Sequence, residues 1–181
     1  MVYDDVLPHY LCQKLIDKFE ANENDVQVDT VFKNVRHFKE INLSQHWQDE
    51  HQIIVNVQQI AWKNYMAAQR LRYDIEWPQQ FGFEAFRMKR YLPNGKDQFG
   101  PHTDVGSYAS ARRFLAFLWY LNSVENGGET GFGLDVDNPD LTVPAKEGRL
   151  LMFPPLWTFT HWGAKPKSGL KYIISSYLHY I

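Results

Sequence analysis

Residues 149–180 read RLLMFPPLWTFTHWGAKPKSGLKYIISSYLHY, and this stretch decides which fold we expect. Three short runs within it, Arg149–Phe153, Trp157–Trp162 and Leu170–Tyr180, are rich in aromatic and aliphatic residues and are typical of β-strands. Turn-forming residues separate the runs, most clearly in the segment Lys165–Gly169. The C-terminal part of the chain is therefore predicted to consist of short strands.

The same pattern extends back to Pro78. Residues 83–92, 113–121 and 141–143 also predict strands, and Gly, Pro and Asn residues separate them. Several short strands at this spacing favour a β-sandwich or jelly roll. Further upstream, residues 9–21 and 45–72 carry apolar residues at helical spacing, and residues 26–41 alternate as one or two strands. We therefore predict a mainly β fold with N-terminal helices and a jelly-roll core.

Length and composition indicate one domain over residues 1–181, with about 1–78 as a support region and about 79–181 as the jelly-roll core. The chain is 44% hydrophobic and carries a net charge of -2, so neither nucleic acid nor an anionic membrane is expected as a partner. We find neither a signal peptide nor an apolar run of about eighteen residues. The single cysteine, Cys12, excludes an internal disulfide and is expected to be buried, which favours a cytoplasmic setting.

His102, Asp104 and His161 form the candidate site that carries chemistry. Residues two apart on a strand point to the same side, so His102 and Asp104 are expected to face one cavity. Two imidazoles and one carboxylate leave coordination positions of a metal open. This set suits Fe(II) oxygen chemistry, and Zn(II) or Mn(II) can occupy the same ligands, so the residues predict a metal site without identifying the metal.

Lys171 is expected to lie beside this site. If the segment Gly163–Gly169 closes as a symmetric turn, His161 and Lys171 face each other on neighbouring strands, with their Cβ atoms about 5 Å apart. An ammonium group that points into a barrel is costly unless it meets an anion. A 2-oxo acid that chelates the metal and carries a second carboxylate at its far end would satisfy Lys171.

Further motifs occur in a fixed order along the chain. They are Arg90-Tyr91, His102-Thr103-Asp104, Tyr120-Leu121-Asn122, Gly127-Gly128-Glu129-Thr130, Pro144 through Gly148, and His161 with Lys171 following it. With this ordered set, the chain resembles the prolyl 4-hydroxylase-like branch of the Fe(II)/2-oxoglutarate-dependent oxygenases from its first helix to its C-terminus. The resemblance implies a double-stranded β-helix, which is a cupin-like jelly roll.

The resemblance also implies roles for individual residues. His102, Asp104 and His161 would hold Fe(II), which would chelate the 1-carboxylate and the 2-oxo group of 2-oxoglutarate. Lys171 would pair with the distal 5-carboxylate of the same molecule. The remaining candidate contacts to the cosubstrate are Tyr91, Tyr120 and Thr130.

Other residues near these motifs are weaker candidates. Ser175 and Tyr177 share the strand face of Lys171 and are expected to serve packing more than function. Arg87 and Lys89 alternate with Tyr91 and could form a cationic rim that receives the substrate, although a solvated strand face explains them equally well.

The implied reaction hydroxylates a substrate C–H bond with O2, while 2-oxoglutarate is decarboxylated to succinate and CO2; ascorbate is a candidate reductant. Asp104 is an acid where halogenating relatives carry a small residue, which favours hydroxylation over halogenation. The stretch between Tyr91 and His102 departs from the family pattern, because it is one residue longer than usual and has Phe99 where a tyrosine is common.

Peptidyl proline is the substrate that the resemblance favours, and a free amino acid or another small molecule is the alternative. The segments expected to select the substrate are Val26–Ser44 and Gly95–Arg112. Two other classes of protein stay open at this point. A non-catalytic, metal-binding cupin-like module would not need Lys171 beside its ion, and a zinc hydrolase would not need a 2-oxo acid.

Overall fold

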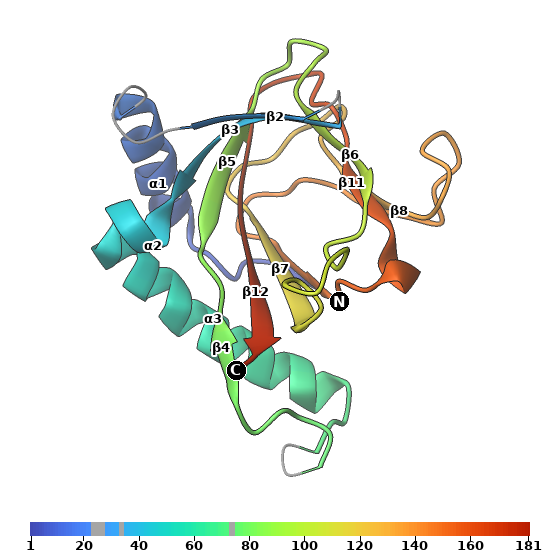
Figure 1. Ribbon diagram of the computed structural model, residues 1–181. Helices are drawn as coiled ribbons and strands as arrows, with labels where there is room; N and C mark the ends of the chain where they lie inside the picture. The colour runs from blue at the N-terminus through green and yellow to red at the C-terminus, as the bar shows by residue number, and fades with distance from the viewer. Residues whose placement is uncertain (23–27, 33–34, 73–74) are drawn as a thin grey trace.

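The computed structural model describes residues 1–22, 28–32, 35–72 and 75–181. Its α-helices precede most of its strands, and they lie together on one side of a curled sheet (Figure 1). The helices are α1 (His9–Ala21), α2 (Leu43–His46), α3 (Gln48–Ala68) and the 3-10 helix η1 (Trp157–Phe159). The strands are β1 (Val2–Tyr3), β2 (Val28–Phe32), β3 (Arg36–Asn42), β4 (Phe81–Phe83), β5 (Arg87–Tyr91), β6 (Gln98–His102), β7 (Arg113–Tyr120), β8 (Thr130–Phe132), β9 (Leu141–Val143), β10 (Leu150–Phe153), β11 (His161–Gly163) and β12 (Lys171–Tyr180).

The strands form one curled antiparallel sheet in the part of the chain that the structure describes. Their order is β1-β10-β7-β12-β5-β3-β6-β11-β8-β9, with β2 also paired to β3 and β4 to β12. Strands β5, β7 and β12 form one wall of the interior, and β6, β8 and β11 form the wall opposite it, since one cavity is lined from both sets (Figure 1). This arrangement confirms the predicted mainly β fold with a jelly-roll core.

The alternation of side chains along β12 explains how one strand serves both the core and the cavity. Tyr172 and Ile174 point to the outer face of the sheet and are 3% and 0% exposed in a core shared with the helices. Lys171 and Ile173 point to the inner face and line the cavity. This period of two is the normal geometry of a strand that is buried on both faces.

Helices α1 and α3 cover the outer face of the wall formed by β5, β7 and β12. Leu11, Leu15 and Phe19 recur at a spacing of four along α1, so they form one stripe, and all three are fully buried. Ile54 of α3 belongs to the same core. Each such side chain contributes roughly 1.5–3 kcal/mol through its burial, so the helices brace the wall that carries β5 and β12.

Most predicted elements are present, and the differences have physical reasons. The predicted strand Trp157–Trp162 is wrong in its first half, where Phe159 N–H donates to the Leu156 carbonyl at 2.9 Å and closes the turn of η1. Strand β8 was not predicted, because Gly131 interrupts a short segment that otherwise lacks a strand pattern. The strand expected to contain His102 and Asp104 is β6, which ends at His102. The predicted strand region 26–41 corresponds to β2 and β3, with residues 26–27 and 33–34 outside the described ranges.

The predicted pairing of His161 with Lys171 is also wrong. Strand β11 pairs with β6 and β8, while Lys171 pairs with Tyr91 across β12 and β5. The segment between β11 and β12 therefore crosses from one wall of the interior to the opposite wall and is no hairpin. His161 and Lys171 approach the same cavity from two sides.

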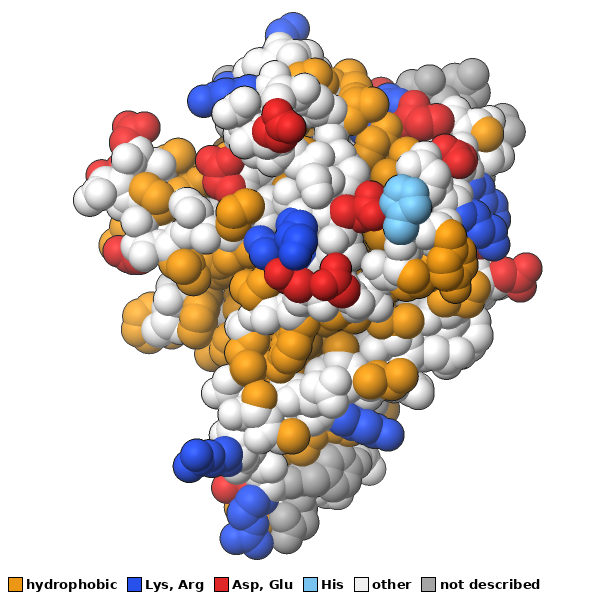
Figure 2. Space-filling view, turned by 180° about the vertical axis from the view of Figure 1, so that it is seen from behind, with side chains coloured by type: hydrophobic (Ala, Val, Ile, Leu, Met, Phe, Trp, Pro, Cys, Tyr) orange, Lys and Arg blue, Asp and Glu red, His pale blue; other side chains and the backbone are white. Residues whose placement is uncertain are grey.

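Two expectations from composition can be compared with the structure. Cys12 is buried, as predicted, with 0% exposure. Among the described residues, the structure contains no helix with the length and apolar character needed to cross a bilayer. On the face drawn in Figure 2, basic and acidic side chains are scattered among hydrophobic ones, which agrees with the balanced charge of the chain.

Candidate active site

The pairing of β6 with β11 brings His102 and His161 together. These two residues are direct partners across the two strands, and their ring centroids are 4.2 Å apart. Asp104 follows two residues after His102, in a bend just beyond the strand that we expected to contain both residues. His102 Nε2 lies 3.5 Å from Asp104 Oδ1, and His161 Nε2 lies 3.4 Å from Asp104 Oδ2. The structure therefore places three potential metal-binding groups within 4.8 Å of one another.

Backbone hydrogen bonds fix the tautomer of both histidine rings. His102 Nδ1 lies 2.8 Å from the Gly100 carbonyl oxygen, and His161 Nδ1 lies 2.9 Å from the Phe159 carbonyl oxygen. A carbonyl oxygen only accepts, so both Nδ1 atoms carry hydrogen, and in the neutral rings the Nε2 lone pairs point towards Asp104. Burial lowers the pKa of His161 to about 4, which keeps its ring neutral near pH 7.

Asp104 is held as a carboxylate. Its burial opposes ionisation, but the neighbouring histidines and the Tyr177 hydroxyl outweigh this effect and hold its pKa at about 2. The Tyr177 hydroxyl donates to Asp104 Oδ1 at 2.7 Å, whereas Oδ2 is buried with no hydrogen-bond partner among the described residues. Two imidazole lone pairs and a buried, unsatisfied carboxylate oxygen face one point. A divalent cation at this point would satisfy all three groups, so the residues fit a metal.

A second layer of contacts holds Asp104 in place. Arg113 donates to the backbone carbonyl of Asp104 at 2.9 Å and stacks over the Tyr177 ring at 4.1 Å. Two further hydrogen bonds, 2.8 and 2.7 Å long, join Arg113 to the carboxylate of Glu84. Such outer contacts orient a ligand before any metal arrives.

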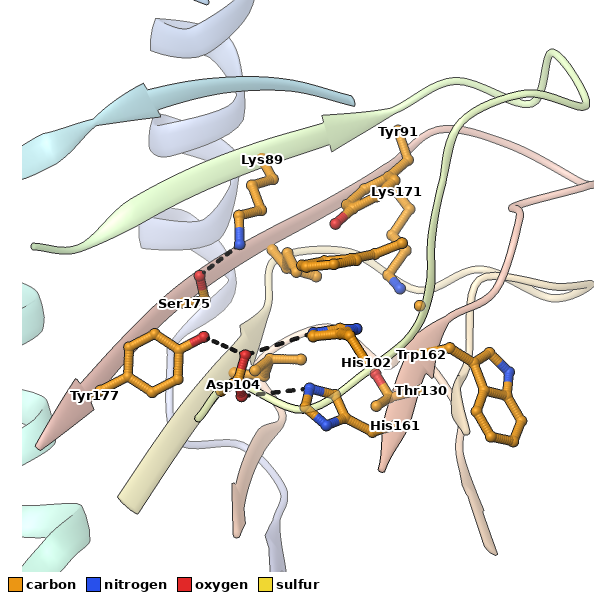
Figure 3. Close-up of a pocket in the computed structure, with 14 residues that line it drawn as sticks. Lys89, Tyr91, His102, Asp104, Thr130, His161, Trp162, Lys171, Ser175 and Tyr177 are labelled. Carbon is orange, nitrogen blue, oxygen red and sulfur yellow. Dashed lines mark hydrogen bonds and ion pairs between the residues drawn. The ribbon is translucent and has the colours of Figure 1, made fainter. Parts of the chain in front are cut away.

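Lys171 lies in the interior of the same cavity (Figure 3). It is 1% exposed, and its ammonium lies 5.2 Å from the centre of the Tyr91 ring and 5.9 Å from that of Tyr120. Burial lowers its pKa to about 7. Within the described part of the chain, this ammonium forms neither a hydrogen bond nor an ion pair. A buried cation without a protein partner creates a local preference for an anion.

The other predicted cosubstrate residues lie around Lys171. Tyr91 and Thr130 line the cavity, whereas Tyr120 lies behind it and reaches it through a 2.6 Å hydrogen bond to Thr130 Oγ1. Burial raises the pKa of Tyr120 above its usual value, so its hydroxyl remains a donor. Trp162 points away from the cavity in Figure 3 and packs against Gly131, where a Cβ atom would collide with the indole ring.

Four residues have a larger place in this cavity than their sequence pattern suggested. Phe99, at the position where the family favours tyrosine, stacks on the His102 ring with centroids 3.6 Å apart. Ser175 and Tyr177, which were expected to serve packing, both line the cavity. Lys89 is 8% exposed and points inward, so its interpretation as part of a solvated strand face is wrong. For Lys89, Ser175 and Tyr177 the signal was the period of two that they share with Tyr91 and Lys171 on their strands. Phe99 lies three residues before His102, so this period did not indicate it, and the pairing of β6 with β11 is irregular between these two residues.

The remaining histidines form no second metal site among the described residues. His37 pairs with Asp97 at 2.6 Å, and His9 pairs with Glu147 at 2.7 Å. The cluster of His102, Asp104 and His161 is the group that meets the geometry of a metal site within those residues.

Solved structures with the same fold include enzymes of different activities. The viral collagen prolyl hydroxylase of Paramecium Bursaria Chlorella virus-1 matches with a TM-score of 0.71 and 20% identity over 100% of this chain and 96% of that one. A prolyl hydroxylase from Trichoplax adhaerens, in complex with a hypoxia inducible factor peptide, matches with a TM-score of 0.75 and 15% identity over 99% of this chain and 82% of that one. The epimerase SnoN of nogalamycin biosynthesis matches with a TM-score of 0.69 and 16% identity over 98% of this chain and 76% of that one.

Sequence comparison identifies the family directly. No curated protein matches this chain. The family model of the 2OG-Fe(II) oxygenase superfamily, however, matches residues 86–179, a range that contains every residue of the cavity described above. Enzymes of this family use Fe(II), 2-oxoglutarate and O2. Because the match covers more than half of its 181 residues, the chain belongs to the 2OG-Fe(II) oxygenase superfamily.

Proposed function

We propose that this chain hydroxylates a C–H bond of its substrate. One oxygen atom of O2 would enter the new hydroxyl group and the other would enter succinate, as 2-oxoglutarate loses CO2; two electrons from each of the two organic molecules reduce O2 completely. The observation that carries this proposal is the coexistence, in one cavity, of an unsatisfied Asp104 oxygen between two histidines and of the unpartnered ammonium of Lys171. A metal chelated by a 2-oxo diacid matches both features.

In this proposal each residue has a defined task. His102, Asp104 and His161 hold Fe(II), which supplies the redox chemistry that couples O2 to the oxidation of cosubstrate and substrate. Lys171 receives the 5-carboxylate of 2-oxoglutarate. Tyr91 lines the path between these two points. Thr130 would offer its hydroxyl group to the cosubstrate, and Tyr120 would support it from behind the cavity through the hydrogen bond that it donates to Thr130.

The surroundings of the site support this assignment by keeping water away and by fixing orientation. His161, Lys171 and Thr130 are each at most 4% exposed, so the cosubstrate would be removed from bulk solvent. Electrostatic interactions are stronger in such a site than in water. Asp104 retains Oδ2 for the metal because Tyr177 occupies Oδ1.

Peptidyl proline is the candidate substrate that the fold likeness favours. Support comes from the fold likeness to two prolyl hydroxylases, one of which is bound to a peptide. A free amino acid or another small molecule is the second candidate, and the buried lysine Lys89 favours it. The unpartnered Lys171 argues against a zinc hydrolase and against a non-catalytic cupin-like module, because neither class needs an anion beside its metal.

Three further properties belong to the proposal. We regard residues 1–181 as one domain, because the same core contains side chains of α1 and of β12. The single buried cysteine suits a reducing compartment such as the cytoplasm. Ascorbate would act as an accessory reductant.

An anaerobic titration tests the activity. Fe(II) and 2-oxoglutarate added together are expected to give a weak visible band near about 500 nm, which arises from the metal and the chelated 2-oxo group. Admission of O2 should then produce succinate, and Asp104→Ala should abolish both signals. A protein that binds Fe(II) but gives neither the band nor succinate would exclude this function. The target can be sought among candidate peptides and amino acids by a mass gain of about 16 Da, which is one oxygen atom.

A further inference from the structure

A second buried lysine, Lys89, points into the same cavity as Lys171. Lys89 lies on β5, two residues before Tyr91, and is 8% exposed. Its ammonium donates to Ser175 Oγ at 2.8 Å and lies 5.3 Å from the centre of the Phe38 ring (Figure 3). An ammonium group can donate three hydrogen bonds, so two remain for a ligand.

The charge of Lys89 has no carboxylate partner among the described residues. No acidic oxygen lies within 4.0 Å of its nitrogen, although Arg87 and Arg113, which line the adjoining groove, each have one. Arg87 pairs with Glu40 at 3.5 Å, and Arg113 pairs with Glu84 at 2.7 Å. Burial lowers the pKa of Lys89 to about 8, because the more distant carboxylates of Glu40 and Asp104 do not offset the loss of hydration.

Lys89 is placed on the substrate side of the proposed metal. Lys171 pairs with Tyr91 and Ile173 pairs with Lys89, so the two lysines are separated by about two residues, or roughly 7 Å, along their strands. Lys89, unlike Lys171, also lines the adjoining groove of about 380 Å³ that leads past Asp104. Lys171 therefore lies in the interior, and Lys89 lies where the cavity meets the groove.

A charge count shows that the cosubstrate does not satisfy both lysines. A divalent metal, the Asp104 carboxylate and two ammonium groups leave three positive charges in the cavity. 2-Oxoglutarate brings two negative charges, one of which chelates the metal and the other of which reaches Lys171. One positive charge remains, and Lys89 carries it where the cavity meets the groove.

We propose that Lys89 binds the free carboxylate of the residue that is hydroxylated, so that the substrate is an amino or imino acid with an unblocked carboxyl group. This inference rests on the proposed function and specifies its substrate class. A free amino acid and the C-terminal residue of a peptide both offer this group. A residue inside a polypeptide does not, because its carboxyl carbon is an amide and would leave the cation unpaired.

The test compares acids with their amides on the holoenzyme. The probes are the protein amino acids, free proline among them, and short peptides ending in each of these residues, all as free acids and as carboxamides. Binding is measured by calorimetry under argon with Fe(II) and 2-oxoglutarate present, and turnover by succinate and by mass. We expect at least one acid to bind about 10- to 100-fold more tightly than its amide, the range of a charge-assisted hydrogen bond in a buried site. Free amino acids and peptides form separate arms and distinguish the two sources.

Variants assign the preference to Lys89. Lys89→Met keeps the length of the side chain and should remove most of the preference for the acid, whereas Lys89→Arg should restore part of it. Lys63→Met, which removes a positive charge from the distant helix α3, serves as the matched control and should keep the preference. If Lys89→Met does not fold, as judged by circular dichroism, the comparison of acid with amide on the wild-type protein still tests the inference.

Results that would overturn the inference differ from the result that would contradict the proposed activity. Equal binding of acids and amides, or no binding of any acid at millimolar concentration, would overturn the inference. An equal loss of 2-oxoglutarate affinity in Lys89→Met would also overturn it, because Lys89 would then serve the cosubstrate. Acid-selective binding without succinate under any condition would contradict the proposed activity while supporting the binding role of Lys89.

Discussion

Lys171 is the residue whose chemistry constrains the cosubstrate most closely. It is a cation with 1% exposure, it lies against the rings of Tyr91 and Tyr120, and its pKa is lowered to about 7 by burial. Rings stabilise a cation only modestly, by about 0.5–2 kcal/mol, which is less than the cost of removing an ammonium from water. An anion is therefore the missing partner, and the distal carboxylate of 2-oxoglutarate is the anion that the family supplies.

Replacing Lys171 should weaken cosubstrate binding more than metal binding. We expect Lys171→Met to raise the Kd for 2-oxoglutarate about 10- to 100-fold, because it removes a charge-assisted hydrogen bond in a buried site. Anaerobic calorimetry measures this constant, and Lys165→Met on the exposed neighbouring segment is the control. An unchanged Kd would show that the carboxylate lies elsewhere.

Tyr177 should act as a positioning residue for Asp104. Its hydroxyl donates to Asp104 Oδ1 at 2.7 Å, so Tyr177→Phe would leave this oxygen free to rotate or to bind water. We expect the affinity for Co(II) or Mn(II) to fall about 10-fold or more, as for other outer contacts of metal ligands. Competition with a chelating dye gives the constant, and Tyr180→Phe, at a residue 51% exposed, is the control. Equal affinities would assign Tyr177 to packing.

Sequence reasoning located the metal cluster because His102, Asp104 and His161 are uncommon residue types whose order matches a family pattern. It named Lys89 as a possible substrate-receiving residue but did not decide between this role and a solvated strand face, for a physical reason. A lysine on a strand is usually solvated, and its inward direction depends on which face of β5 meets the cavity. That choice is made by the packing of Met88 on the other face against the helices, which a single strand does not reveal.

At the scale of elements, short strands of the second wall are the least predictable part. Strand β8 has three residues with a central glycine, and Gly131 is needed there because the Trp162 ring occupies the space of a side chain. The longer strands β7 and β12 were predicted nearly to their ends, because eight and ten residues carry a clear pattern. The partners of β11 depend on contacts distant in sequence, and this is why its predicted register failed.

Asp4 links the N-terminal segment to the residues that precede β10. Its carboxylate accepts hydrogen bonds from Arg149 at 2.7 Å and from Lys146 at 3.0 Å, just before β10. Chiefly through the Arg149 hydrogen bond and then that of Lys146, its pKa falls from 3.8 to about 2. A carboxyl group with a lowered pKa in the folded state stabilises the fold above its unfolded pKa, and this contribution is lost as the pH falls through the folded value.

Asp4→Asn should therefore destabilise the protein at pH 6 by about 1 kcal/mol or less, since solvent screens a side chain that is 38% exposed. The difference from wild type should shrink by roughly half at pH 3, between the two pKa values. Urea unfolding at both pH values measures it, and Asp5→Asn is the control. A difference independent of pH would mean that the amide group packs poorly and that the ion pair contributes nothing.

At the scale of the molecule, the cavity lies between two walls that belong to one curled sheet. The β5 and β12 wall contributes Lys89 and Lys171 and is braced by α1 and α3, while the opposite wall contributes His102 and His161. The two walls are joined directly where β3 pairs with β6 through two residue pairs. A ligand held by both walls should therefore stabilise the whole fold, whereas a ligand held by one wall should stabilise less.

This architecture predicts a stepwise effect on thermal unfolding. Mn(II) alone, held by the histidine wall, should raise the Tm modestly, and Mn(II) with 2-oxoglutarate should raise it further, because the diacid links the metal to Lys171 on the other wall. At a ligand concentration of about 100 times the Kd, binding adds about 2.7 kcal/mol to the free energy of unfolding. For a chain of this size, this raises the Tm by roughly 5–10 °C. Glutarate has both carboxylates but no 2-oxo group to complete the chelate, so it should add little. In Lys171→Met the metal shift should persist and the additional 2-oxoglutarate shift should largely disappear. Differential scanning fluorimetry gives all of these values, and equal shifts for glutarate and 2-oxoglutarate would show that the two walls are not linked through the metal.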